Sequence, residues 1–177
     1  MARHSDITVV IPCFNHGRFL LDSVDRALGQ DGGPPKVIVV DDGSTDEATL
    51  RALDEVPREV EVIRQANAGV AAARNAGFEN SDSELLLMVD ADDRLTTDAL
   101  DVLRPPLEAN PDVGYCYGLM RLIGTWSGSC ASPTSTPTSC CTARSPGRSS
   151  VSSAAGAGRT PAASTPRSTA MRTGTSA

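Results

Sequence analysis

Three carboxylates crowd into four positions directly after the most apolar run of the chain. Asp90, Asp92 and Asp93 follow residues 85–89, a run of leucine, methionine and valine. Like charges this close repel, and removing them from water costs several kcal/mol each unless a positive charge is present. Carboxylates without histidine or thiolate neighbours favour hard cations, and Mg²⁺ is usually held by one or two carboxylates plus substrate phosphates. The cluster indicates either a solvated strand end with helix-capping aspartates or a site for Mg²⁺ or Mn²⁺ beside a diphosphate.

Two further polar clusters also follow apolar runs. In Asp41-Asp42-Gly43-Ser44, Gly43 permits a tight turn, and a carboxylate there could accept hydrogen bonds from a base or a ribose. The same segment also suits an ordinary strand-to-helix turn. Pro12-Cys13-Phe14-Asn15 is the other cluster. Arg74 lies in an alanine-rich run, and its spacing does not decide between a phosphate, a base and the solvent as its neighbour.

The elements that carry these clusters alternate between strand and helix from residue 7 to about residue 117. Short runs rich in Val, Ile or Leu and bounded by Pro, Gly or Asp predict strands, and apolar residues at helical spacing predict helices. The predicted strands cover residues 7–11 (stopped by Pro12), 37–40, 60–63 (near an edge), 85–89 (central) and 113–117, and the predicted helices cover 19–28, 45–55, 70–78 and 100–107. Such alternation builds an α/β fold with a mainly parallel sheet flanked by helices. Because ligands bind beyond the carboxyl ends of such strands, we expect the three clusters to meet at one edge.

The composition divides the chain into two parts. All 22 Asp and Glu residues lie within residues 1–126 beside 11 Lys and Arg, which gives this part a net charge of −11. Residues 127–177 contain no acid and no lysine, but five arginines among Ser, Thr, Ala, Pro and Gly. We expect 1–126 to form the domain and 127–177 to be a low-complexity, disordered tail, because it has too few large apolar residues to offset its ordering entropy. The acidic domain argues against nucleic acid as a partner.

The cysteines and the apolar runs set the expected environment of the protein. Five cysteines lack paired CxxC spacing, and Cys13 and Cys116 lie in or beside strand-like runs, which favours buried thiols. No signal-peptide pattern opens the chain, and no apolar run approaches the roughly 20 residues of a transmembrane helix. We therefore expect no transmembrane segment and a cytoplasmic location.

Several motifs in order resemble those of one known family. The first two are Val9-Val10-Ile11-Pro12-Cys13-Phe14-Asn15 and Val37-Ile38-Val39-Val40-Asp41-Asp42-Gly43-Ser44-Thr45-Asp46. Asn67-Ala68-Gly69, Ala73-Arg74-Asn75 and Asp90-Ala91-Asp92-Asp93 follow them. Over about residues 6–120 the chain resembles the N-terminal, nucleotide-sugar-binding half of family 2 glycosyltransferases of the Rossmann-like GT-A fold. The resemblance implies a nucleotide-sugar donor, usually a UDP- or TDP-sugar, a divalent metal, Mg²⁺ or Mn²⁺, and transfer of the sugar to an acceptor hydroxyl.

The resemblance also implies roles for particular residues. Substrate binding falls to Pro12 and Asp42 at the nucleobase, to Asp41 in support, and to Asn15, Arg74 and Asp90. The family's metal-binding DxD motif corresponds to Asp90 and Asp92, with Asp92 or Asp93 holding the metal and the other contacting ribose. The acceptor is a sugar, polysaccharide, lipid or protein that the sequence does not name.

The resemblance stops near Trp126. Family members continue with a Gly-Gly-Phe-Asp segment and a Glu-Asp-Trp-like segment that supplies the catalytic base, and residues 127–177 contain neither. Codons can be chosen for residues 159–177 that, read from the third base, give Asp-Ala-Gly-Gly-Phe-Asp-Pro-Ala-Phe-Asp-Gly-Tyr-Glu-Asp-Trp. We therefore hypothesise a frameshift or truncation between about Trp126 and Pro137, and impaired transfer.

Two alternatives to a glycosyltransferase follow from the same residues. A non-catalytic nucleotide-binding or interaction module would need no catalytic base. A nucleotidyltransferase would need a Gly-rich, Lys- or Arg-containing loop after the first strand, which Pro12-Cys13-Phe14-Asn15-His16-Gly17-Arg18 does not supply convincingly.

Overall fold

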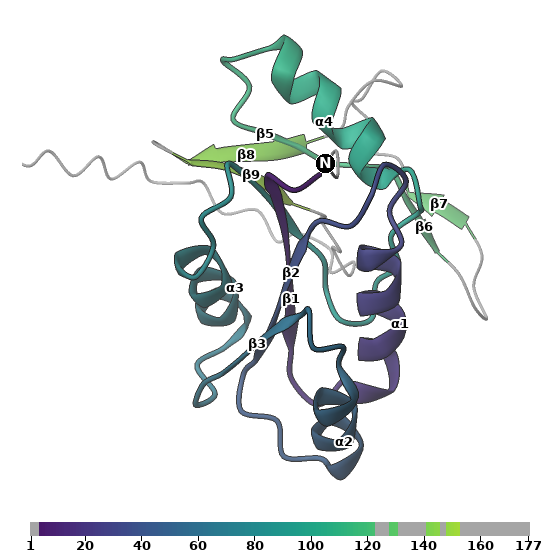
Figure 1. Ribbon diagram of the computed structural model, residues 1–177, viewed down its shortest axis with the longest axis vertical. Helices are drawn as coiled ribbons and strands as arrows, with labels where there is room; N and C mark the ends of the chain where they lie inside the picture. Colours follow the sequence, from purple (N-terminus) through teal and green to yellow (C-terminus); the bar gives the residue numbers. More distant parts are fainter. Residues whose placement is uncertain (1–3, 123–127, 131–140, 146–147, 153–177) are drawn as a thin grey trace, which may run out of the picture.

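The computed structural model describes residues 4–122, 128–130, 141–145 and 148–152, and strands and helices alternate along the first of these segments (Figure 1). The first four strands are β1 (Ile7–Cys13), β2 (Lys36–Asp41), β3 (Glu61–Arg64) and β4 (Leu85–Met88). The helices are α1 (Gly17–Leu28), α2 (Glu47–Glu55), α3 (Val70–Glu79) and α4 (Ala99–Ala109). Each element predicted from the hydrophobic pattern is present at its expected place.

The first four strands form a parallel sheet in the order β3, β2, β1, β4. The chain therefore adds strands to one side of β1 first and then returns through α3 to place β4 on its other side. Such a reversal of strand order opens a crevice between the carboxyl ends of the two strands at which it occurs, here β1 and β4. The predicted mainly parallel α/β sheet is confirmed, as are the edge position of β3 and the central position of β4.

Three of the remaining described strands extend this sheet beyond β4, and two form a separate sheet. They are β5 (Tyr115–Cys116), β6 (Met120–Leu122), β7 (Gly128–Cys130), β8 (Cys141–Ser145) and β9 (Arg148–Ser152). β9 pairs in parallel with β4, β8 and β5 follow in antiparallel pairing, and β6 pairs with β7 in a separate two-stranded sheet. Of residues 127–177 the structure describes only β7, β8 and β9. The predicted disorder of the tail therefore stays a prediction.

The sheet has a hydrophobic cluster on each face because alternate residues of a strand point to opposite sides. Val9 and Ile11 of β1 belong to a cluster with buried residues of α1, α2 and α4, whereas Val10 packs with α3. Figure 1 shows α3 on one side of the strands and α1 and α2 on the other. The approach of α3 is close, because a Cβ added at Gly77 would lie 2.2 Å from Cγ1 of Val10.

Strand β1 runs further than predicted. The prediction ended it before Pro12, but the strand continues to Cys13, with Pro12 opposite Val40 of β2. The backbone carbonyl of Val10 accepts a hydrogen bond from the β4 side, and alternate residues of a parallel strand bond to the same neighbour. The missing N–H of Pro12 therefore faces the side on which β4 has already ended, and no ladder hydrogen bond is lost.

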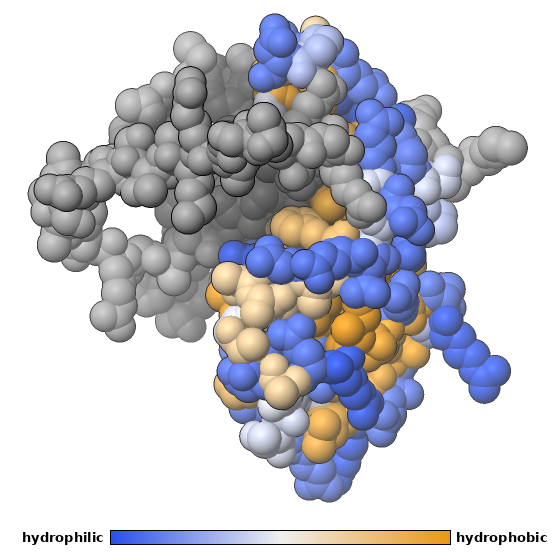
Figure 2. Space-filling model, turned by 90° about the vertical axis from the view of Figure 1, so that its left-hand side faces the viewer, coloured by the Kyte–Doolittle hydropathy of each residue, from blue (hydrophilic) through white to orange (hydrophobic). Residues whose placement is uncertain are grey.

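Figure 2 shows the face that carries α3, where apolar residues lie between hydrophilic ones over the described part of the molecule. None of the helices within the described residues has the length and hydrophobicity needed to cross a membrane.

Cys13 and Cys116 are buried free thiols, as predicted. Side chains of the other three cysteines lie outside the described residues.

Candidate functional site

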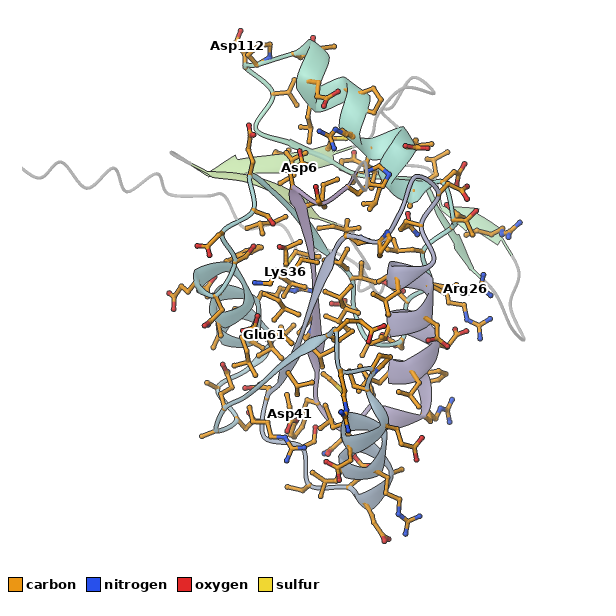
Figure 3. All side chains as sticks on the ribbon, viewed as in Figure 1. Asp6, Arg26, Lys36, Asp41, Glu61 and Asp112 are labelled. Atoms are coloured by element: carbon orange, nitrogen blue, oxygen red, sulfur yellow. The ribbon has the colours of Figure 1, made fainter. Side chains whose placement is uncertain are left out.

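A cleft of about 430 Å³ opens at the carboxyl ends of β1, β2 and β4. In Figure 3, the label Asp41 marks the carboxyl ends of these strands, and the label Asp6 marks the end of the sheet at which β1 begins. The cleft is lined by Pro12, Cys13, Phe14, His16, Asp42, Asn67, Gly69, Val70, Ala73, Asp90, Ala91 and Asp92. Four of the eight residues predicted for the site, Pro12, Asp42, Asp90 and Asp92, line this cavity. The other four, Asn15, Asp41, Arg74 and Asp93, are not among the residues that line it.

The loop after β1 is tied to the start of α2 by Asn15. Its side-chain oxygen accepts hydrogen bonds from the backbone N–H groups of Thr45 (2.8 Å) and Asp46 (3.1 Å), and its own N–H donates to Oγ of Ser44 (3.0 Å). Asn15 has a φ of +56°, a conformation that asparagine tolerates better than most residues. Asn15 is not among the cleft-lining residues. The arrangement suits a residue that positions two loops.

Phe14 and His16, on either side of Asn15, line the cleft although the sequence analysis assigned them no role. Phe14 is 44% exposed, so one large apolar side chain stands open to a ligand at this edge. The signal available in the sequence was an aromatic residue placed directly after a buried strand. Such a ring offers a face on which a planar base can stack.

Asp41 is buried and shapes the turn that follows β2. Its Oδ1 accepts a hydrogen bond from the N–H of Ser44 at 2.9 Å. Gly43 within this turn has a φ of +75°, and a Cβ there would approach the backbone nitrogen of Asn67 to 2.8 Å. The turn therefore requires glycine on two grounds, a left-handed backbone and a close neighbour. Asp41 thus fixes the turn beside the cleft and is not among the residues that line the cleft.

Asp42 points its carboxylate at the loop between β3 and α3. Oδ1 accepts from Nε2 of Gln65 (2.8 Å) and from the N–H of Ala68 (2.9 Å), and Oδ2 accepts from the N–H of Gly69 (2.8 Å). Burial acts to raise the pKa of Asp42, but these three hydrogen bonds outweigh it and hold the pKa below its ordinary value. Asp42 is therefore a carboxylate at neutral pH, and it orders the loop that carries Asn67 and Gly69 into the cleft wall.

The start of α3 forms the next part of the wall. Gly69, with a φ of +90°, precedes the helix, and Val70 and Ala73 on its first turn line the cleft. The first N–H groups of a helix have no partner within the helix, and the aligned peptide dipoles place partial positive charge at this end. This end of the cleft therefore favours an anionic ligand such as a phosphate.

The loop after β4 carries the three crowded aspartates. Asp90 pairs with Arg74 of α3, with Nη2 and Oδ1 2.7 Å apart, and the N–H of Asp93 donates to the backbone oxygen of Asp90 at 2.9 Å. Burial, followed by the charges of Asp90 and Asp92, raises the pKa of Asp93 to about 6. Asp92 is exposed and lines the cleft, whereas Asp93 lies half-buried beside it. The structure thus brings the predicted Arg74 to the predicted Asp90, a contact that sequence spacing could not decide.

The three aspartates fit a cation that a substrate helps to hold. Within the described residues no group of three or more His, Cys, Asp or Glu side chains is arranged to hold a metal ion by itself. Mg²⁺ in phosphate sites commonly has only one or two carboxylate ligands and takes its others from phosphates and water. Asp92 and Asp93 supply hard oxygen ligands of that number, and the charges of Asp90 and Asp92 add to burial in raising the pKa of Asp93.

Comparison with known proteins gives a family match over the same region. The sequence model described as Glycosyl transferase family 2 matches residues 8–127. The chain is 33% identical over 123 residues to glycosyltransferase GlyA of Streptococcus pneumoniae, an alignment covering 67% of this chain and 18% of that protein. It is 34% identical over 121 residues to the uncharacterized glycosyltransferase alr2836 of Nostoc, covering 67% of this chain and 38% of the relative. The chain therefore spans less than half of these relatives.

Solved structures share the fold. TarS of Staphylococcus aureus superposes with a TM-score of 0.51 at 24% identity, over 63% of this chain and 21% of that one. The mannosyltransferase PcManGT of Pyrobaculum calidifontis, solved with GDP-Man and Mn²⁺, gives 0.51 at 24% identity, over 64% of this chain and 35% of that one. Likenesses at this identity show the GT-A fold alone. With the family match over residues 8–127, which includes every strand end and loop of the cleft, this chain belongs to glycosyl transferase family 2.

Proposed function

We propose that residues 1–126 form the donor-binding half of a glycosyltransferase. The ligand is a nucleoside diphosphate sugar, UDP- or TDP-linked, and the reaction is transfer of its sugar to an acceptor hydroxyl. The observation that carries the proposal is the meeting, in one cleft, of Asp42 at the end of β2, the start of α3, and Asp90 and Asp92 at the end of β4. Membership of the family supplies the reaction class.

The nucleobase lies, in this proposal, at the end of the cleft formed by Pro12, Phe14 and Asp42. A carboxylate has about four lone-pair sites, and the three hydrogen bonds to Asp42 leave about one for an N–H of the base. Because the pKa of Asp42 is lowered, that acceptor stays charged at neutral pH. The exposed ring of Phe14 provides apolar surface for the base.

The diphosphate lies between the start of α3 and the aspartates of the β4 loop. Asp92 and Asp93, with Asp90, would hold Mg²⁺ or Mn²⁺ there. A divalent cation, when bound, neutralises the diphosphate and stabilises it as a leaving group. The family and the GT-A fold favour divalent metal use, and the choice between Mg²⁺ and Mn²⁺ is left to experiment.

Transfer itself is proposed to be impaired. Residues 127–177 contain no aspartate or glutamate, so no acidic side chain from them can take the proton of an acceptor hydroxyl. The same lack favours a second candidate, a nucleotide-binding module without catalysis. A frameshift between about Trp126 and Pro137 would account for the lost base, and sequencing the gene tests it. Codons that cannot yield the Gly-Gly-Phe-Asp and Glu-Asp-Trp segments in another frame would remove that explanation.

Calorimetric titration tests donor binding. The full 177-residue chain is titrated with UDP-, GDP- and TDP-sugars, with and without Mn²⁺. We expect one nucleotide to be preferred and Mn²⁺ to strengthen its binding. Asp92→Asn should reduce the effect of Mn²⁺ by about tenfold, because a charged ligand is lost. Asp98→Asn is the matched control, since Asp98 is an exposed residue before α4 whose side chain makes no capping bond. Equal losses in both variants would contradict the assignment.

Turnover separates the enzyme from the binding module. The purified chain is incubated with the preferred nucleotide sugar, and release of nucleoside diphosphate is followed with and without simple sugar acceptors. Binding without release agrees with either an impaired transferase or a binding module. Restoring the shifted frame in the gene should recover release of nucleoside diphosphate if the chain is an impaired transferase. If the chain is a binding module, the restored frame should give no release. Rapid release by the unaltered chain would refute the impairment.

A further inference from the structure

The connection between β4 and α4 runs from the cleft to the far end of α1. The structure describes residues 89–98 throughout, and they join β4 to α4 as turns and irregular backbone. Near β4 the connection carries Asp90 and Asp92 into the cleft wall. Further along, Arg94 pairs with Asp22 of α1. The connection therefore passes from the cleft to α1 before α4 begins.

Gln30, two residues beyond the end of α1, holds the far end of this connection. Its Nε2 donates to the backbone oxygens of Arg26 (2.9 Å) and Thr96 (2.8 Å), and its Oε1 accepts from the N–H of Leu100 at 3.1 Å. Gln30 is buried, and both N–H groups and the oxygen of its amide have a partner. The amide thus joins the last turn of α1 to two positions of the connection and of α4.

The bond to Leu100 takes the place of an N-terminal cap on α4. The first N–H groups of a helix have no partner within the helix, and a side chain at the cap position often satisfies one of them. Asp98 occupies that position, but its side chain makes no capping bond. The N–H of Leu100, the second residue of α4, is satisfied by Gln30 from a distant part of the chain. The N–H of Asp31 adds a bond to the backbone oxygen of Thr97 at 2.7 Å.

The far end of the connection limits where its first residues can lie. Thr96 follows Asp92 by four residues, and a residue spans at most about 3.5 Å, so the two lie within about 14 Å of each other. Releasing Thr96 and Leu100 would give the connection more conformations, and ordering it again would cost conformational entropy. Asp90 and Asp92 would then be held less firmly in the cleft.

We propose that Gln30 is a positioning residue for the loop after β4. It fixes the start of α4 on the end of α1 and thereby holds Asp90 and Asp92 at the diphosphate end of the cleft. Asp42 at the other end has its own partners in the loop before α3 and does not depend on Gln30. The inference rests on the proposed function, because it assumes that the aspartates after β4 serve the diphosphate end.

Amide hydrogen exchange tests the positioning without any ligand. Gln30→Met keeps a side chain of similar length and removes all three hydrogen bonds. The reporter is the N–H of Asp93, which donates to the backbone oxygen of Asp90 within the loop, and we expect its exchange to become about tenfold faster. The N–H of Gly69, which donates to Asp42, should change by less than about twofold.

Titration with UDP measures the consequence for the cleft. The full chain is titrated by calorimetry with UDP in the presence of Mn²⁺ and again in the presence of EDTA. In Gln30→Met the gain in UDP affinity from Mn²⁺ should fall about threefold to tenfold, because Asp90 and Asp92 are placed less well. The affinity in EDTA should stay within about twofold of the natural value. A merely structural role would weaken UDP binding equally in both conditions, and that outcome overturns the inference.

Ser81→Ala is the matched control for the loss of a buried polar contact. Ser81 is buried in the connection before β4, and its hydroxyl donates to Oγ1 of Thr8 at 2.7 Å, near the start of β1. The change should leave both the exchange at Asp93 and the gain from Mn²⁺ unaltered. An effect in Ser81→Ala equal to that in Gln30→Met would overturn the inference.

The unaltered chain supplies a second measurement that decides if Gln30→Met does not fold. Exchange is followed at increasing urea below the unfolding transition. The N–H groups of Asp93 and Leu100 should open as one unit, with a common dependence on urea, and Gly69 should open separately. Opening of Asp93 together with Gly69 rather than with Leu100 would overturn the inference.

Failure of the inference and failure of the proposed function give different results. In Gln30→Met, an unchanged exchange rate at Asp93 or an unchanged gain from Mn²⁺ overturns the inference. Binding of UDP by the natural chain, strengthened by Mn²⁺, would then leave the proposed function standing. If the natural chain binds neither UDP nor Mn²⁺, the proposed function falls, and the exchange rate of Asp93 still decides whether Gln30 positions the loop.

Discussion

Two loops carry aspartates to the same edge of the sheet, and their carboxylates have opposite surroundings. In the Asp42 loop, residues 41–46, the carboxylate of Asp42 accepts three hydrogen bonds at 2.8–2.9 Å, and its pKa is lowered. In the Asp90 loop, residues 89–95, burial and two neighbouring carboxylates raise the pKa of Asp93 to about 6. The two loops line the same cleft. Hydrogen bonds from the protein stabilise the charge of Asp42, whereas burial and neighbouring carboxylates destabilise the charge of Asp93.

The difference indicates what each loop contributes. The carboxylate of Asp42 accepts hydrogen bonds from backbone N–H groups of the loop before α3 and thereby fixes the conformation of that loop. Within the described residues, the Asp90 loop retains repulsion that is relieved by the single ion pair between Asp90 and Arg74. Proteins tolerate crowded, partly buried carboxylates where a ligand supplies the missing positive charge. The cation is therefore expected at the Asp90 loop and the planar, hydrogen-bonding part of the donor at the Asp42 loop.

The largest expected effect is on the Asp42 loop. Asp42→Ala leaves the N–H groups of Ala68 and Gly69 and the amide of Gln65 without their acceptor, and we expect the free energy of unfolding to fall by about 3 kcal/mol. Asp92→Ala, the matched change on the other loop, removes an exposed carboxylate and should alter stability by less than about 0.5 kcal/mol. Urea denaturation at neutral pH measures both. Equal losses would erase the distinction between the loops.

The second effect concerns the support of the Asp42 loop by Asn15. Asn15→Ala removes the acceptor for Thr45 and Asp46 and places alanine at a positive φ, and we expect a loss of about 2 kcal/mol in the free energy of unfolding. Asn15→Asp keeps an acceptor oxygen and is the control, with a loss of less than about 1 kcal/mol. Thermal unfolding compares them. A large loss in both would mean that the amide nitrogen, rather than the oxygen, carries the role.

The hydrophobic pattern predicted the frame of the site well, because strands and helices follow from local periodicity. The run 85–89 and the acids behind it identified β4 and its loop without any knowledge of neighbours. Pro12 misled the prediction of β1, since its effect depends on where β4 ends. The partners of Asp42 lie 23 to 27 residues away and could not be predicted, because they depend on how the loops fold together.

The pairing of Arg74 with Asp90 could not be predicted either. Spacing within α3 shows which helix face an arginine occupies, but not which loop that face meets. That meeting depends on how α3 packs on the sheet, where a Cβ added at Gly77 would lie 2.2 Å from Cγ1 of Val10 in β1. One glycine in an alanine-rich run does not by itself predict a close contact between helix and strand. Long-range packing, rather than the local motif, therefore determines which carboxylate Arg74 pairs with.

A third effect separates the loops by their response to pH. The folded-state pKa of Asp93, about 6, lies above the ordinary aspartate value, so the folded state is favoured below about pH 4 and this advantage is lost as pH rises through about 6. Asp93→Asn should therefore stabilise the protein at about pH 7 by about 1 kcal/mol, after allowance for solvent screening of a half-exposed carboxyl. Urea denaturation at pH 4 and pH 7 should show the gain only at the higher value.

The Asp42 loop should respond in the opposite sense. Because the pKa of Asp42 is lowered, its contribution to stability is present above about pH 4, the ordinary aspartate value, and is lost as pH falls through its folded-state pKa. Asp42→Asn should remove that dependence on the acid side and leave the response between pH 4 and pH 7 unchanged. A gain at pH 4 from Asp93→Asn, or a flattened response between pH 4 and pH 7 from Asp42→Asn, would contradict the contrast.

The smallest effect calibrates the comparison with an ordinary carboxylate outside both loops. Glu61 of β3 pairs with Lys36 of β2 at 3.3 Å, both about two-fifths exposed, and both are labelled in Figure 3. Exposed pairs of this kind contribute little because solvent screens them and two flexible side chains must be held. A double-mutant cycle with Lys36→Met and Glu61→Gln should give a coupling below about 0.5 kcal/mol. A coupling as large as the fall in the free energy of unfolding in Asp42→Ala would mean that carboxylates stabilise this sheet wherever they lie. The Asp42 loop would then not differ from an ordinary surface ion pair.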